Sequence, residues 1–126
     1  MKVKVDSIML FVQNIDNLKT FYVTILELEI VEENSPNWLL LNAGTCNIGL
    51  HKIGEEYLEK TQNEFKFDSN TKIVFEIESD IYSYRNFLLS KGIKLKEVMS
   101  WENYPFLICD GEDPEGNVFQ LKVKKE

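Results

Sequence analysis

The residues that could take part in catalysis are few and lie far apart in the sequence. His51 is the only histidine, so one chain alone cannot build a two-histidine metal site or a histidine-paired nucleophile. Glu76 lies in an apolar segment, where a carboxylate could have a raised pKa, act as a general base or anchor a cationic ligand. An ion pair of Glu76 with Lys72, Arg85 or Lys122 is an equally good interpretation, because buried carboxylates are seldom left unpaired.

A second group of residues could bind a ligand without reacting with it. The Gln120 amide could orient a ligand through hydrogen bonds. Trp101 and Tyr104 lie in a segment expected to be a loop, where binding residues concentrate. Aromatic residues and methionines at strand spacing belong more often to a core than to a ligand site. The further apolar candidates for a pocket wall are Met9, Phe11 and Trp38.

Two apolar strands, expected at residues 3–12 and 72–77, would present these side chains. Alternate residues of a strand point to opposite faces of its sheet. One face is uniformly apolar and should pack under a helix: Ile8, Leu10, Val12, Ile73, Phe75 and Ile77. The other face mixes polar and apolar side chains and should line a pocket with Gln120: Ser7, Met9, Phe11, Lys72, Val74 and Glu76. His51 shares a strand face with Gly49 and is expected near the mouth of that pocket, with Trp101 closing over it.

The second half of the chain repeats the plan of the first. Helices are expected at residues 17–26, capped by Asn14 or Asp16, and at 82–91, capped by Ser79 or Asp80. The remaining strands are expected at 29–33, 38–42, 46–53, 93–99, 105–110 and 117–124, and residues 54–68 form a connector that is helical at 55–62. The pattern predicts an α+β fold of one domain, residues 1–126, with pseudo-repeats at about 1–54 and 70–126. Two β-α-β-β-β units would form an open, cup-shaped mixed sheet with the helices outside.

Composition limits the possible functions. The 126 residues are 44% hydrophobic and 28% charged, which is typical of one soluble globular domain. We expect a cytoplasmic protein without membrane contact, because no apolar run is long enough to span a membrane or to form a signal peptide. The formal net charge of −7 argues against a nucleic-acid surface, which would need a basic stripe. Cys46 and Cys109 are too few for a disulfide framework and are expected as free, buried thiols.

Several motifs then point to a family. Residues 10–15 (LFVQNI), the pair Phe21-Tyr22 and residues 28–31 (LEIV) form the opening part, and residues 113–121 (DPEGNVFQL) form a closer match at the end. Together they resemble the vicinal-oxygen-chelate superfamily, which includes lactoylglutathione lyases, extradiol dioxygenases and bleomycin-resistance proteins. The resemblance implies a cup of paired β-α-β-β-β units and a homodimer. Glu27 departs from it, since the superfamily often has glycine there.

The resemblance also implies where a metal would bind. Metal-dependent members place one ligand, typically histidine or glutamate, on the first and last strand of each unit. The corresponding positions in this sequence are Ser7, Gly49, Lys72 and Gln120. Serine and glutamine are weak neutral donors, glycine has no side chain, and lysine would place a like charge against the metal. We therefore expect no metal and no other cofactor.

Three functional hypotheses remain. The first is a metal-independent small-molecule-binding protein similar to the drug-sequestering bleomycin-resistance proteins, without catalytic residues and with a ligand that Glu76 would favour as a cation. The second is a metal-dependent lyase, isomerase or dioxygenase, and the third is an enzyme that uses Glu76 or His51 as a general base without a metal. The ligand-binding residues predicted for the first hypothesis are Ser7, Met9, Phe11, Trp38, His51, Lys72, Glu76, Trp101, Tyr104 and Gln120.

Overall fold

The computed structural model describes residues 2, 4–54 and 71–126. The chain divides into two compact units, Met1–Phe65 and Lys66–Glu126. The predicted connector helix at 55–62 lies outside the described residues. No helix in the described part of the chain has both the length and the apolar character needed to cross a membrane.

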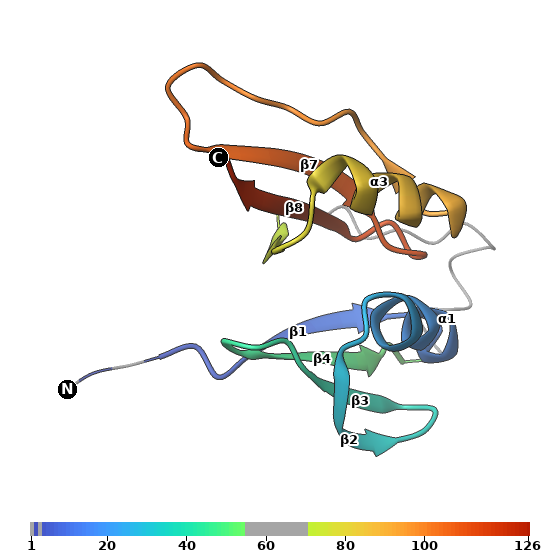
Figure 1. The fold of residues 1–126 in the computed structure, drawn as a ribbon. Helices are drawn as coiled ribbons and strands as arrows, with labels where there is room; N and C mark the ends of the chain where they lie inside the picture. The colour runs from blue at the N-terminus through green and yellow to red at the C-terminus, as the bar shows by residue number, and fades with distance from the viewer. Residues whose placement is uncertain (1, 3, 55–70) are drawn as a thin grey trace. The chain divides into compact units, whose positions relative to one another are not determined.

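The first unit is a four-stranded mixed sheet with one helical segment (Figure 1). The strands lie in the order β1-β4-β3-β2, with β1 parallel to β4 and the other neighbours antiparallel. Within the helical segment, α1 packs on β3 and β4. The elements are β1 (Ser7–Val12), α1 (Ile15–Lys19), the π-helical turn η1 (Thr20–Ile25), β2 (Glu29–Asn34), β3 (Trp38–Asn42) and β4 (Asn47–Lys52).

The second unit has the same topology. Its strands lie in the order β5-β8-β7-β6, again with only the first pair parallel. The predicted α+β class and the two β-α-β-β-β units are therefore confirmed, whereas their assembly into a cup stays a prediction. The elements are β5 (Ile73–Glu76), α3 (Ile81–Ser90), β6 (Lys94–Leu95), β7 (Phe106–Glu112) and β8 (Val118–Lys124).

Local signals start and stop the two helical segments. The Asn14 side chain accepts a hydrogen bond of 3.2 Å from the Asn17 amide, and the Asp80 side chain accepts one from Ser83. Asn14 and Asp80 are therefore the caps, as two of the four candidates predicted. Gly92 follows α3 with a φ of 82°, a conformation that favours glycine at a helix end.

Each unit buries its own apolar core between helix and sheet. In the first unit the helical residues Leu18, Phe21 and Tyr22 are buried, as are alternate residues of β3 and β4. Each such side chain contributes about 1.5–3 kcal/mol by leaving water. In the second unit the core contains Ile81, Leu88, Cys109, Phe119 and Leu121.

Of the predicted boundaries that the structure corrects, three have a clear cause. The first strand begins at Ser7 rather than at residue 3, because its partner β4 begins at Asn47. The helix predicted at 17–26 begins at Ile15. Its second half is a π-helix, in which the Leu26 amide donates a hydrogen bond to the Phe21 carbonyl, five residues earlier.

The third wrong boundary is the strand predicted at 93–99, which pairs regularly only at Lys94–Leu95. Leu95 lies opposite Gly111 and Met99 opposite Ile108. This segment therefore has one more residue than the stretch of β7 that it faces, and such a bulge interrupts the ladder.

Candidate functional site

The sheet of the first unit has one face packed under the helical segment and one open face. Val12 and Leu50 are fully buried, whereas Met9 and Phe11 are 45% and 55% exposed. The predicted alternation of faces along β1 is therefore observed. Ser7, on the same face by alternation, is half-buried and pairs in register with Asn47.

Gly49 lies on this open face beneath two large side chains. A Cβ atom built on Gly49 would overlap the Met9 sulfur and lie 2.8 Å from Cη2 of Trp38. The space above the backbone is thus filled by a thioether and an indole, which can lie this close only because residue 49 lacks a side chain. The result is an apolar floor, which we define as Met9, Phe11, Trp38 and His51 around Gly49.

His51 belongs to this floor and is exposed. Its ring centroid lies 5.6 Å from that of Phe11 and 6.2 Å from that of Trp38. Nδ1 lies 2.9 Å from the Lys52 carbonyl oxygen. Because a carbonyl oxygen only accepts hydrogen bonds, this contact requires a proton on Nδ1, and in the tautomer that meets this requirement Nε2 is an acceptor.

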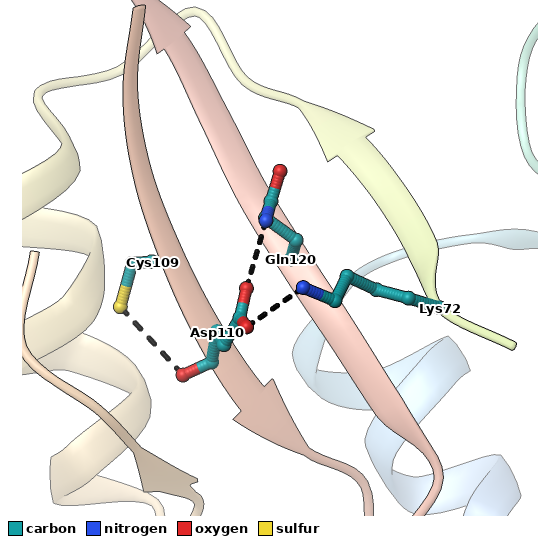
Figure 2. A network of polar contacts seen from close by, with 4 residues as sticks. All are labelled: Lys72, Cys109, Asp110 and Gln120. Atoms are coloured by element: carbon teal, nitrogen blue, oxygen red, sulfur yellow. Dashed lines mark hydrogen bonds and ion pairs between the residues drawn. The ribbon is translucent and has the colours of Figure 1, made fainter. Parts of the chain in front are cut away.

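On the open face of the second unit, Asp110 joins Lys72 and Gln120 in a network of polar contacts (Figure 2). The Asp110 carboxylate accepts a hydrogen bond of 2.8 Å from Lys72 Nζ and one of 2.9 Å from Gln120 Nε2. Figure 2 shows the Gln120 amide oxygen pointing away from Asp110. Two predicted ligand-binding residues from β8 and the segment before β5 are thus joined by a third residue, from β7, that sequence reasoning missed.

Neighbouring groups determine the ionisation state of the Asp110 carboxyl group. Burial raises the pKa of Asp110, but the hydrogen bonds from Lys72 and Gln120 and the positive charges of Lys72 and Lys96 outweigh it, so the pKa lies below its ordinary value. Asp110 therefore remains a carboxylate at neutral pH and fixes the Lys72 ammonium in place.

The two cysteines differ. Both are free, and Cys109 is buried whereas Cys46 is only half-buried, so the prediction of two buried thiols is wrong for Cys46. The Cys109 thiol donates to the Lys96 carbonyl at 3.2 Å, and burial raises its pKa. A protonated, buried thiol is a poor nucleophile.

Glu76 is exposed on β5. The three cations expected as its partners each contact another group: Lys72 pairs with Asp110, Arg85 with Glu97 at 3.4 Å, and Lys122 lies 4.0 Å from the Phe106 ring centroid. Its role as an anchor for a cationic ligand stays a prediction.

The loop before β7 carries two exposed aromatic side chains. Trp101 is 50% exposed, and its ring packs edge-on against Tyr104, which in turn contacts Phe106. Lys125 Nζ donates to the Trp101 carbonyl at 2.7 Å. The loop is therefore tied to the end of the chain, while closure of Trp101 over a ligand stays a prediction.

The residues at the four expected metal positions do not form a suitable donor set. In the first unit Gly49 offers no donor, and Met9 and Trp38 fill the space above it. In the second unit Lys72 is a cation, and Gln120 uses its amide nitrogen on Asp110. Within residues 4–54 and 71–126, no three His, Cys, Asp or Glu side chains gather to hold an ion. These residues do not fit a divalent cation, which needs anionic or imidazole ligands.

Comparison with known proteins gives a likeness at the level of structure. No family model matches the sequence, and no curated protein matches it. A lactoylglutathione lyase from Agrobacterium tumefaciens superposes with a TM-score of 0.74 at 13% identity, over 98% of this chain and 95% of the other. A fosfomycin resistance protein from Listeria monocytogenes superposes with a TM-score of 0.77 at 16% identity, over 99% and 96% of the two chains. An integron cassette protein from V. Cholerae has a TM-score of 0.72 at 19% identity, over 99% and 98%.

Such identities establish a common fold rather than a common activity. The repeated β-α-β-β-β topology and the neighbours agree with the motifs at the two ends of the sequence. The chain therefore has the same fold as these structural neighbours.

Proposed function

We propose that this chain binds a small organic molecule on the open faces of its sheets and needs no divalent metal to do so. The observation that carries the proposal is Gly49: the position expected to hold a metal ligand has no side chain, and Met9 and Trp38 occupy its place. An exposed floor of aromatic and thioether groups suits the apolar part of a ligand, and a few polar groups suffice to orient it.

The fold is compatible with this role. The structural neighbours include both a lactoylglutathione lyase and a fosfomycin resistance protein. A drug-sequestering protein of the bleomycin-resistance type needs affinity for its ligand and no reacting group. Binding alone therefore requires only an apolar surface and a few polar groups, and the described residues include both.

The first experiment is a thermal-shift screen against antibiotics and metabolites, run with and without EDTA. We expect at least one compound to raise the melting temperature equally in both conditions, since ligand binding stabilises the folded state. Elemental analysis of protein purified without chelators should find no stoichiometric divalent ion. About one tightly bound ion per chain, together with loss of binding in EDTA, would favour the metal-dependent hypothesis instead.

Substitutions on the floor test where the ligand binds. Trp38→Ala should weaken binding about ten-fold, because a buried aromatic contact is typically worth more than 1 kcal/mol. Gly49→Ala should also weaken it, because the new methyl group displaces Met9 and Trp38. Tyr82→Ala is the matched control, since Tyr82 is an exposed aromatic residue on α3. Equal affinity of all three variants and the parent chain would place the site elsewhere.

One observation favours a second candidate function, a metal-independent enzyme. The bond from His51 Nδ1 to the Lys52 carbonyl leaves Nε2 able to accept a proton on an exposed face. If His51 is a general base, His51→Gln should abolish turnover of a ligand found in the screen even at concentrations that saturate binding. If the parent chain turns over none of the compounds that it binds, the enzyme hypothesis is wrong and the proposal of binding without catalysis remains.

A further inference from the structure

A groove of about 280 Å³ opens in the second unit beside the edge strand β6. It is lined by Lys94 and Lys96 on one side and by Asp110, Glu112 and Val118 on the other. Gly111 and Leu95 complete the lining. Lys94 lies opposite Glu112, and Glu112 lies opposite Val118, so these three side chains share one sheet face.

The lysines are the charges in this groove that a ligand can reach most easily. Lys94 and Lys96 are exposed, whereas Asp110 and Glu112 are half-buried. The Asp110 carboxylate is bonded to Lys72 and Gln120, and the positive charge of Lys96 further lowers its pKa. The Lys72 ammonium compensates the negative charge of Asp110, so the other charged residues that line the groove, Lys94, Lys96 and Glu112, carry a formal excess of one positive charge.

This local balance contrasts with the whole chain, whose formal net charge is −7. Three lysines, Lys72, Lys94 and Lys96, surround Asp110 and Glu112 on this face. An acidic protein repels anions over most of its surface, so a positive groove is the place where an anion would be concentrated.

We propose that this groove binds the anionic group of a small organic molecule, a carboxylate or a phosphonate, with Lys94 and Lys96 as its partners. Val118 supplies an apolar contact for the body of the ligand on the same sheet face as Lys94 and Glu112, and the volume suits a molecule of the size of benzoate. The inference rests on the proposed function, small-molecule binding, and adds the charge of the ligand and the groove that receives it. This inference predicts an anionic ligand, whereas from the sequence we expected Glu76 to favour a cationic one.

A charge series of nearly equal shape tests the sign. Benzoate, its neutral amide benzamide and the cation benzylamine are titrated into the protein and followed by two-dimensional NMR of the backbone amides. We expect benzoate to shift the amides of Leu95, Lys96 and Gly111 in a saturable way, and phenylphosphonate to do so more strongly. Added salt should weaken the effect, because the lysines are exposed. Stronger binding of benzylamine at these amides would overturn the inference.

Paired variants test the partners. Lys94→Ala combined with Lys96→Ala should weaken benzoate binding about ten-fold, since two exposed ion pairs of up to about 1 kcal/mol each are lost. Lys4→Ala combined with Lys91→Ala removes the same total charge from exposed positions outside the groove and should change the affinity less than two-fold. Glu112→Gln should strengthen benzoate binding. Equal losses in the two double variants would show that net charge alone acts, and would overturn the inference.

The single variants Lys94→Gln and Lys96→Gln give the same test if the double variant is poorly folded. The result also separates the two proposals. If compounds of any charge bind to the floor residues while benzoate does not bind in the groove, the inference fails and the proposed function stands. If neither the screen nor the charge series detects binding, the proposed function fails and the inference fails with it.

Discussion

Asp110 illustrates how a single residue can organise a polar surface. It accepts hydrogen bonds from Lys72 and Gln120, whose positions the family resemblance assigned to metal ligands. The carboxylate fixes the Lys72 ammonium in place and forms a formally neutral ion pair with it. The Asp110–Lys72 pair is partly exposed, with side-chain exposures of 26% and 41%, so its contribution to stability is modest.

Asp110→Asn should lower the free energy of unfolding at pH 7 by about 1 kcal/mol, because the amide cannot accept both bonds. The pKa of Asp110 is lowered in the folded state. Its stabilisation is therefore present above the ordinary carboxyl value of about 4 and is lost as the pH falls through the folded value. Urea unfolding at pH 7 and at pH 3 should show the difference between the parent chain and Asp110→Asn shrinking in acid. A difference that grows in acid would contradict the assignment.

Glu27 is the one non-glycine residue in the described part of the chain with a positive φ, 64°. It follows η1, at the position where the superfamily often has glycine. A left-handed conformation costs a non-glycine residue about 1–2 kcal/mol, of which glycine's greater freedom in the unfolded chain cancels about 0.5–1 kcal/mol.

Glu27→Gly should therefore raise the free energy of unfolding by about 0.5–1 kcal/mol. Glu27→Ala removes the same charge but keeps the strained backbone, so it should give no such gain. Chemical denaturation of the three proteins at one pH measures both effects. Equal stability of the glycine and alanine variants would show that the conformation at residue 27 costs little.

At the scale of elements, the turn between β7 and β8 is built around one buried carboxylate. Asp113 is only 4% exposed. Its Oδ1 accepts from the amides of Glu115 and Asn117, and its Oδ2 accepts from the Asn117 side chain, all at 2.9 Å. Gly116 completes the turn with a φ of 82°. The motif at residues 113–117 thus fixes the hairpin that aligns Asp110 with Gln120.

Asp113→Ala should destabilise the protein by about 2–3 kcal/mol, because three hydrogen bonds to a buried, charged acceptor are lost. Asp113→Asn keeps one oxygen for the two amides and should cost about half as much. Thermal unfolding followed by circular dichroism compares them. If the alanine variant were no less stable than the asparagine variant, the hydrogen bonds would not be what holds the turn.

At the scale of the whole molecule, apolar side chains remain exposed in both units. They include Ile30 and Val31 on β2 and Tyr82, Phe87 and Leu89 on α3. Surfaces of this kind are often buried by association with a second copy. The family resemblance adds the expectation of a homodimer.

We therefore predict a dimer with twice the 14.8 kDa mass of one chain. Light scattering coupled to gel filtration, repeated over a dilution series, measures that mass directly. A constant mass of one chain at micromolar concentration would contradict the prediction, since a stable interface of standard size survives such dilution.

The sequence by itself determined most of what depends on neighbours along the chain. The alternation in β1, the caps Asn14 and Asp80, and the turn at residues 113–116 each follow from contacts within a few residues. The duplicated order of elements was readable for the same reason. The predicted ends of strands were wrong where pairing with a distant strand decides them, as at the bulge between Leu95 and Met99.

Only the tertiary structure decided which side chains meet. Lys72 and Asp110 are 38 residues apart in sequence, and the groove combines β6 with the facing ends of β7 and β8. Likewise, Met9 and Trp38 cover Gly49 from two different strands. Side-chain periodicity fixes the face of a residue, but its neighbours on that face depend on the register between strands. That register is set by packing of the whole unit, which no local pattern in the sequence encodes.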